Sequence, residues 1–332
     1  MEIMSIPLAM IIIIVIALFF EFSNGFHDTS NAVATSIATK SLEPFQAISI
    51  SAIFNLIGAV SGTAVAVTIA KGFADPKLAT DVVILSALLA AISWNLLTWS
   101  IGMPSSSSHA IIGGLVGGVI FSHGFNQVNY FALLNKVIVP MVVSPILGFI
   151  IAGVIVVIMG KLLNNTEPRK INNKIRELQV LSTAFLSFSH GAGDAQKTMG
   201  IITLTLFNFH MIDTVTVPIW VIFLCALCMA LGTFVGGVRI IKTLSTRVAK
   251  LKPTNGFAAE LSSAMLLFVG ARLGIPLSTT HAVTGSIMGA GTTTRFGLNW
   301  SVVRNMIIAW VFTLPMSALV SGVFVHIIRI FW

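Results

Sequence analysis

Residues 24–31, with the sequence NGFHDTSN, place charged and amide side chains inside an apolar stretch and decide the fold. Residues 190–197, HGAGDAQK, align with them position by position. Residues 102–110, GMPSSSSHA, align in the same way with residues 274–282, GIPLSTTHA. Because both pairs occur in the same order, the sequence predicts two related halves of about 160 residues each.

The composition places the chain in a lipid bilayer. Of the 332 residues, 56% are hydrophobic and 9% are charged, and the mean hydropathy is +0.96. Soluble domains carry about 25% charged residues, and so few polar groups cannot cover this much apolar surface in water. These values exclude an ordinary soluble enzyme, a disordered chain and a nucleic-acid-binding module, so no nucleic-acid partner is expected.

Uncharged stretches long enough to cross a bilayer recur along the chain. One crossing needs about 20 apolar residues. The first stretch, 3–20, lacks the basic flank of a signal peptide and is expected to be a membrane helix. The others are 44–70, 82–135, 137–160, 214–238, 273–294 and 305–328, and 82–135 is long enough for two crossings. The sequence therefore predicts an all-α integral membrane protein.

The basic residues indicate which side each connection faces. Segments 161–176 and 239–252 each hold five Lys or Arg residues, whereas 71–80, the first-half counterpart of the second segment, holds two. Because Lys and Arg accumulate in cytoplasmic loops, the halves are expected to be inverted, with about five membrane segments each and both termini extracytoplasmic. The predicted first repeat, basic cytoplasmic linker and second repeat are residues 1–160, 161–177 and 178–332.

Glycine and proline mark the places where helices are expected to break at membrane depth. Gly25, Gly191 and Gly193 permit irregular backbone, so short helices are expected to begin near Asp28 and Asp194. The prolines of the other repeated stretches are followed by Ser or Thr, which suits the first turn of a helix. The free N–H groups and the positive dipole end of such a helix attract an anion.

Charged groups in these stretches predict a binding site. A charge at membrane depth costs roughly 2.5–3.5 kcal/mol, so it persists only around a protein-lined cavity. Carboxylates repel an anion, but they are explained if each binds or exchanges a cation, Na⁺ or H⁺, that travels with the anion. The candidates for the coupling cation are Asp28, Asp194, His27, Asn24 and Glu260. The candidates for the anionic substrate are Asn31, Ser106, Ser107, Ser108, Lys197, Thr279 and Thr280.

Several candidates also have a purely structural interpretation. Lys197 lies three residues after Asp194 and is spaced to form a helical ion pair with it. The repeated Ser and Thr residues could serve only as helix caps. His109 and His281 are as consistent with structural hydrogen bonds as with ligand contact.

Other polar residues carry less weight. Glu21 also lies near membrane depth, and Asn95 is a weaker candidate for a cation. Cys225 and Cys228 lie in an apolar run that favours packing over redox or metal chemistry. The sequence therefore predicts no cofactor and no definite metal site.

These stretches resemble the inorganic phosphate transporter (PiT) family, in particular its bacterial low-affinity phosphate permeases. The family signature reads roughly Gly-Ala-Asn-Asp-x-Ala-Asn-Ala once per half, and residues 24–35 and 187–197 are similar to its bacterial version. The repeated Pro-x-Ser-(Ser/Thr)-(Ser/Thr)-His-Ala segments add two matches. The resemblance covers nearly the whole chain. The resemblance implies an inverted-repeat phosphate symporter without enzymatic activity. It also implies a homodimer that lies in the cell (plasma) membrane, which in bacteria is the inner membrane.

Two positions depart from the family pattern. His27 stands where sodium-coupled members carry Asn, and this resembles bacterial proton-coupled relatives that carry metal–phosphate complexes. Gly193 stands where Asn is usual, which removes an oxygen from a sodium site in the second half. The family also contains sulfate carriers, so a sulfate permease is the alternative. A separate soluble regulator accompanies some bacterial members and is a candidate partner.

Two other function classes compete with transport. A hydrolase using Ser108 and His109 is disfavoured because adjacent residues on a helix do not face each other. An anion channel is disfavoured because anion selectivity rings favour Arg or Lys over carboxylates. No Gly-x4-Gly-Lys-(Ser/Thr) loop occurs in the sequence, so ATP-driven pumping by this chain is not expected.

Overall fold

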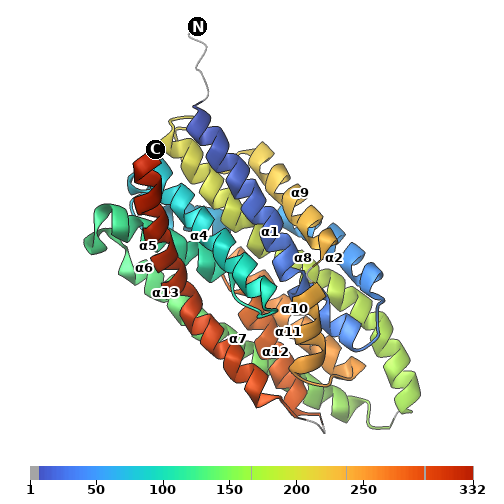
Figure 1. The fold of residues 1–332 in the computed structure, drawn as a ribbon. Coiled ribbons are helices and arrows are strands. Elements are labelled where there is room, and N and C mark those ends of the chain that lie inside the picture. Colours follow the sequence, from blue (N-terminus) through green and yellow to red (C-terminus); the bar gives the residue numbers. More distant parts are fainter. Residues whose placement is uncertain (1–6, 166, 237, 295–296, 332) are drawn as a thin grey trace.

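Long helices with roughly aligned axes make up the molecule, as the computed structural model shows (Figure 1). The structure describes residues 7–165, 167–236, 238–294 and 297–331. Within these ranges the chain forms helices and loops, with one isolated antiparallel bridge between Ala249 and Leu298. The predicted all-α class is confirmed. The remaining residues of the predicted repeats and linker, and the side chain of Arg239 in the second basic segment, lie outside the described part.

The helices follow one another in a fixed order. In the first part of the chain they are α1 (Leu8–Ala38), α2 (Pro44–Ala59), α3 (Ala64–Gly72), η1 (Pro76–Leu78), α4 (Asp81–Ser100), α5 (Ser107–His123), η2 (Phe125–Gln127), α6 (Tyr130–Leu133), η3 (Leu134–Ile138) and α7 (Val139–Leu162). They continue with α8 (Pro168–Asn208), α9 (Ile219–Val235), α10 (Val238–Lys242), η4 (Thr243–Arg247), α11 (Pro253–Arg272), α12 (Thr279–Thr292) and α13 (Trp300–Phe331).

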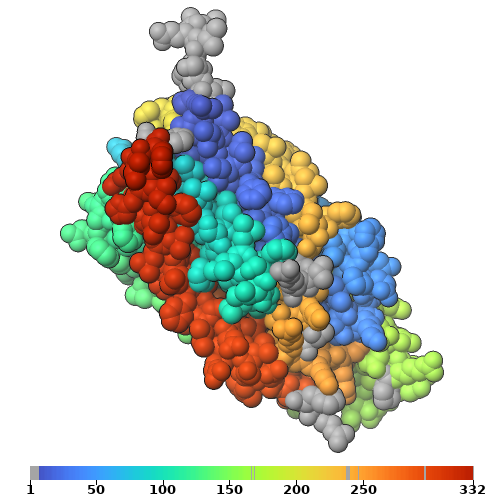
Figure 2. All heavy atoms as spheres, viewed as in Figure 1, coloured from blue at the N-terminus to red at the C-terminus, as the bar shows by residue number. Residues whose placement is uncertain are grey.

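Several helices are long and apolar enough to cross a membrane. In the described part of the chain these are α1, α4, the run Tyr130–Leu162 and α13, and α2 with α3 passes the same test as a pair bent by 67°. α13 runs along the outside of the molecule (Figure 2), where Val311, Leu319 and Val323 are 54–59% exposed. Because lipid, unlike water, accepts such a surface, the protein belongs in a membrane.

Helices α5 and α12 are shorter than a full crossing. They have 17 and 14 residues, which gives lengths of about 26 and 21 Å against a hydrocarbon core of about 30 Å. Pro104 and Pro276 lie in the non-helical segments before them, and the side chains of Ser106 and Ser278 cap them. The breaks predicted at these prolines are therefore confirmed.

The breaks predicted at the glycines are wrong, because α1 and α8 run unbroken through both charged stretches. A Cβ atom on Gly25 would lie 2.5 Å from the carbonyl oxygen of Met229 on α9. A Cβ atom on Gly191 would lie 2.1 Å from the carbonyl oxygen of Asn55 on α2. These two glycines let two helices approach closely, and that close packing explains them without any unwinding of the backbone.

The packing of the two halves is reciprocal. α1 packs on α9 as α8 packs on α2, and α5 packs on α13 as α12 packs on α7. The matched glycines make matched backbone contacts: Gly113 and Gly117 meet Leu314 and Ala318, and Gly285 and Gly289 meet Pro145 and Phe149. The start of α1 and the end of α13 lie at the same end of the bundle (Figure 1). This arrangement brings the middles of α1 and α8 against the starts of α5 and α12.

Candidate functional site

Asp28 on α1 is held by an imidazole and a hydroxyl group. His27 Nδ1 lies 2.7 Å from Asp28 Oδ1, and the hydroxyl of Ser107 at the start of α5 donates to Asp28 Oδ2 at 2.7 Å. The other ring nitrogen of His27 lies 3.2 Å from Thr98 Oγ1 on α4. Because Asp28 is only 1% exposed, these contacts replace the water that a carboxylate requires.

Asp194 on α8 has an ammonium partner. Lys197 Nζ lies 2.5 Å from Asp194 Oδ1, which confirms the helical ion pair that the spacing predicts. His190 Nε2 lies 3.4 Å from Asp194 Oδ2, and the hydroxyl of Thr279 at the start of α12 donates to the same oxygen at 3.4 Å. Asp194 and Lys197 are both at most 1% exposed, so this ion pair is fully buried.

The two carboxylates converge on one point. One ligand atom each of Asp28, His190 and Asp194 lies within 4.8 Å of the others. With the imidazoles neutral, Lys197 offsets one of the two negative charges and leaves the other. A buried charge without a counter-charge is costly, so the electrostatics of this cluster favour a bound cation.

The first turn of α12 is tied to α1 through Asn31. The amide nitrogen of Asn31 donates to Thr279 Oγ1 at 3.3 Å and to Thr280 Oγ1 at 3.0 Å. Asn31 lies one turn after Asp28 on α1, and Thr279 also contacts Asp194. The predicted substrate residues and the predicted cation residues therefore share hydrogen-bond partners.

The starts of α5 and α12 also bond to each other. Thr280 Oγ1 donates to the carbonyl of Ser105 at 2.9 Å, and Ser108 Oγ donates to the carbonyl of Leu277 at 3.3 Å. Ser106 at the cap of α5 accepts a backbone hydrogen bond at 3.2 Å. Capping satisfies one N–H group per helix start, and the other first-turn N–H groups remain suited to an anion.

Two predicted residues stand apart from this cluster. Glu260 on α11 accepts hydrogen bonds from Thr35 at 2.6 Å and Ser36 at 2.9 Å on α1, and from Gln179 at 3.0 Å on α8. The predicted role of Glu260 toward a cation stays a prediction. Asn24 is fully buried on α1, and in the described part of the chain its amide atoms have no hydrogen-bond partner.

Sequence reasoning missed a second row of polar residues around the site. Asn55 Oδ1 on α2 lies 3.0 Å from His190 Nδ1, and the amide nitrogen of Asn55 donates to Thr233 Oγ1 on α9 at 2.9 Å. Thr98 plays the same part for His27 in the first half. The only sequence signal is a lone polar residue in an apolar stretch, which by itself does not identify a partner.

The two repeated histidines face each other. The ring centroids of His109 and His281 are 4.8 Å apart, and the ring of Trp310 lies 4.2 Å from that of His281. His281 Nδ1 lies 3.3 Å from the carbonyl oxygen of Met141. The rings thus pack the starts of α5 and α12 together. Cys225 lies in the apolar core and Cys228 is half-buried.

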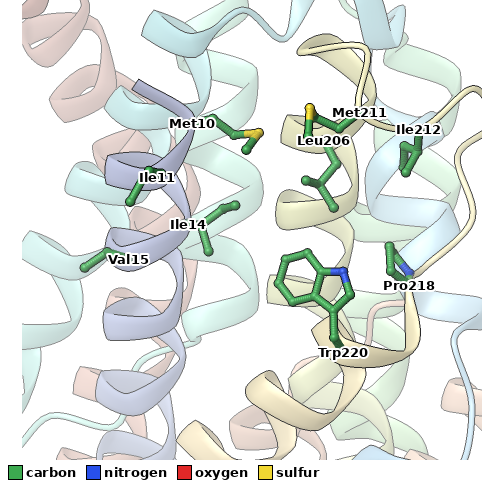
Figure 3. A pocket seen from close by; sticks show the side chains of 9 residues that line it. All are labelled: Met10, Ile11, Ile14, Val15, Leu206, Met211, Ile212, Pro218 and Trp220. Atoms are coloured by element: carbon green, nitrogen blue, oxygen red, sulfur yellow. The ribbon is translucent and has the colours of Figure 1, made fainter. Parts of the chain in front are cut away.

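The site is closed in this conformation, because each of the twelve predicted site residues is at most 2% exposed. A separate pocket of about 460 Å³ lies between α1, α8 and α9 (Figure 3). Its lining includes Met10, Leu206 and Trp220 and holds no charged side chain. An anion would lose its hydration there without gaining partners, so this pocket is not the substrate site.

The comparison with known proteins decides the family. The model described as "Phosphate transporter family" matches residues 24–321. The chain belongs to the phosphate transporter family. A "Probable low-affinity inorganic phosphate transporter" of Bacillus subtilis (strain 168) is 44% identical over 317 residues, covering 94% of this chain and 95% of that protein. A relative with the same description from Rhizobium meliloti (strain 1021) is 43% identical, with 93% of both chains covered.

A solved structure of a sodium-dependent phosphate transporter has the same fold as this phosphate transporter family member. The TM-score is 0.87 at 24% sequence identity, over 98% of this chain and 100% of the other. The resemblance to the phosphate transporters is thus confirmed. The family model and these relatives name phosphate, so the sulfate alternative gains no support.

Proposed function

We propose that this membrane protein is a secondary active transporter that moves inorganic phosphate together with a cation, H⁺ or Na⁺. The observation that carries the proposal is the convergence of Asp28, His190 and Asp194 within 4.8 Å, beside Lys197. Two carboxylates that meet next to one ammonium hold a cation better than an anion. Phosphate can enter such a site only with a positive charge that offsets its own.

The substrate itself is assigned to donors around this point. Lys197 offers an ammonium group, and Asn31, Thr279 and Thr280 offer amide and hydroxyl groups that already bond to one another. The first turns of α5 and α12 add N–H groups and the positive ends of two helix dipoles. A phosphate oxygen would replace the hydroxyl–amide bonds, which keeps every buried donor satisfied during binding.

A divalent metal fits the same cluster when it arrives as part of the substrate. Carboxylate oxygens suit Mg²⁺ and Mn²⁺, and an imidazole nitrogen is accepted by most transition metals. Asp28, Asp194 and His190 supply these ligand atoms. A metal–phosphate complex would therefore bring its own counter-charge to the carboxylates.

Many secondary transporters achieve alternating access with two related halves, and we propose inverted repeats at residues 1–160 and 178–332, joined by a basic linker at 161–177. The reciprocal packing of α1 on α9 and α8 on α2 supports this proposal. The turn between α7 and α8 lies inside the linker, and the linker ends within α8. The plasma membrane location, the extracytoplasmic termini, the homodimer and the soluble regulator are further parts of the proposal, supported by the family resemblance.

A hydrolase is not favoured by the geometry. The hydroxyl of Ser108 donates to the carbonyl oxygen of Leu277, so its proton is directed to a backbone acceptor. His109 packs against the ring of His281. This arrangement does not give Ser108 a general base.

Uptake of radiolabelled phosphate into proteoliposomes tests the proposal. The pH gradient, the Na⁺ gradient and external Mg²⁺ are varied independently, with sulfate as competitor. We expect uptake that follows at least one cation gradient and survives excess sulfate. Phosphate uptake that depends on neither cation gradient would contradict symport. Complete inhibition of phosphate uptake by sulfate would contradict selectivity for phosphate over sulfate.

A further inference from the structure

A third carboxylate, Glu21, lies close to the cluster and is only half satisfied. It is 0% exposed on α1, one turn before Asn24. The hydroxyl of Thr198 on α8 donates to Glu21 Oε2, whereas Glu21 Oε1 has no hydrogen-bond partner among the described residues. Within that same part of the chain, no Lys, Arg or His nitrogen lies within 4.0 Å of this carboxylate.

Two buried asparagine side chains, Asn24 and Asn95, are less satisfied than Glu21 in the described part of the chain. Asn24 is 0% exposed and lies on the same face of α1, three residues after Glu21. Asn95 on α4 is 1% exposed. Among the residues that the structure describes, neither the oxygen nor the nitrogen of either amide has a hydrogen-bond partner. Buried amide atoms without partners are costly, so these side chains mark a place for a polar ligand.

The helix geometry puts Asn24 and Asn95 at one level. α1 and α4 run in the same direction (Figure 1), and His27 contacts Thr98 across their interface. Asn24 lies three residues before His27 on α1, Asn95 lies three residues before Thr98 on α4, and all four are at most 2% exposed. Parallel helices with this spacing pair their residues layer by layer. The two asparagines therefore occupy the layer next to His27 and Thr98, on the side of Glu21.

Glu260 is a buried carboxylate whose two oxygens both have hydrogen-bond donors within the protein. Its two oxygens accept hydrogen bonds from hydroxyl and amide donors on α1 and α8, namely Thr35, Ser36, Gln179, Ser182 and Thr183. These donors fill the lone-pair directions of the carboxylate. In the part of the chain that the structure describes, Glu21 has one such donor. The contrast indicates that Glu21 takes its remaining partner from outside the chain.

We propose that Glu21, Asn24, Asn95 and Thr198 form an oxygen-lined site for an alkali cation, separate from the Asp28–His190–Asp194 cluster. The ligand atoms are one carboxylate, two amide oxygens and a hydroxyl, all of them hard donors that suit a hard cation. The charge balance agrees, because among the described residues of this region the three buried carboxylates Glu21, Asp28 and Asp194 are accompanied by one buried ammonium, that of Lys197. This inference rests on the proposed cation-coupled function and names a second place where a cation binds.

The test measures ²²Na⁺ binding to the purified full chain without phosphate, so it does not depend on transport. We expect Glu21→Gln to raise the Na⁺ dissociation constant by at least about tenfold, a loss of about 1.4 kcal/mol. Thr198→Val and Asn95→Leu keep the shape of each side chain and remove its oxygen, and both are expected to weaken binding in the same direction. Glu43→Gln, at an exposed carboxylate, serves as the matched control and leaves binding unchanged.

The outcomes separate the inference from the function on which it rests. If all three variants bind Na⁺ with the affinity of the wild type, the proposed site is wrong. The proposed site is also wrong if the wild-type chain binds no Na⁺ at pH 7. If Glu21→Gln does not fold, the two remaining variants decide. Absence of phosphate uptake with intact Na⁺ binding that requires Glu21 would instead contradict the proposed function and leave the site standing.

Discussion

Asp28 and Asp194 are repeated residues with different neutralising partners. Asp194 has an ammonium group at 2.5 Å, whereas Asp28 has an imidazole and a hydroxyl at 2.7 Å. We therefore propose that Asp28 is the carboxylate that binds the coupling cation. We expect Asp28→Asn to lower the rate of phosphate uptake by roughly 10- to 150-fold, because a charge-assisted interaction contributes about 1.5–3 kcal/mol.

Uptake by the Asp28→Asn variant is measured in proteoliposomes at equal protein density. Asp213→Asn, an exposed residue in the loop after α8, is the control and keeps the wild-type rate. Wild-type uptake in the Asp28→Asn variant would remove Asp28 from the coupling role. Retention of the variant in the membrane shows that the loss is not a folding defect.

Lys197 is expected to act on stability as well as on transport. Lys197→Met leaves Asp194 buried without its ammonium, which costs about 3–5 kcal/mol of folding free energy. The double variant Asp194→Asn/Lys197→Met removes both charges and is expected to recover most of that loss, while phosphate uptake stays absent. Thermal unfolding in detergent checks this. Equal destabilisation in the single and double variants would show that the ion pair is not what Lys197 contributes.

At the scale of helices, alanine substitutions at two glycines of α8 are expected to have opposite effects on stability, although the two positions are only two residues apart. A Cβ atom on Gly191 would lie 2.1 Å from the carbonyl oxygen of Asn55, whereas a Cβ atom on Gly193 meets nothing within 4 Å. Gly191→Ala is expected to destabilise the protein by about 1–3 kcal/mol through overpacking. Gly193→Ala is expected to be neutral or to stabilise it by up to about 1 kcal/mol, because Ala favours helix.

Thermal unfolding of the two purified variants, compared with the wild type, measures this difference directly. The Gly193 variant is the internal control, since it adds the same methyl group to the same helix. A similar loss of thermal stability in both variants would contradict the packing explanation. It would instead favour a role of both glycines in backbone flexibility, which is the role that the sequence predicts.

The helices also show what the sequence can and cannot predict. Pro104 and Pro276 act locally, since proline with a following Ser cap defines a helix start whatever surrounds it, and both breaks are found. A glycine in a polar stretch has two interpretations, unwinding or close packing. Close packing of Gly191 depends on Asn55, which lies far away in the chain. The residues around Gly191 therefore do not show which of the two interpretations is right.

The same limit applies to the site. The repeat predicts that Asp28 and Asp194 meet, and the structure brings their ligand atoms within 4.8 Å. Asn55 and Thr98 are uncharged and unrepeated, and only the packing of α2 and α4 reveals that they hold the two histidines. A charged residue in an apolar sequence indicates a function because burying its charge in a membrane has a high free-energy cost. A lone amide or hydroxyl has a lower cost, so its presence in the sequence does not indicate a function.

For the whole molecule, the proposed inverted repeats lead to a definite orientation. The start of α1 and the end of α13 lie at one end of the bundle, and the turn between α7 and α8 lies at the other (Figure 1). The basic segment 161–176 surrounds that turn, so it should face the cytoplasm. Both ends of the chain should then face outward.

Single cysteines test this orientation in a background with Cys225→Ala and Cys228→Ala. Leu8 and Phe331 are 71% and 84% exposed at one end, and Glu177 is exposed near the other. We expect a membrane-impermeant maleimide to label Leu8→Cys and Phe331→Cys in intact cells, and Glu177→Cys only after permeabilisation. Labelling of Glu177→Cys from outside would reverse the orientation. Labelling of only one of the two end positions would exclude an odd number of crossings per half, because the ends would then lie on opposite sides of the membrane.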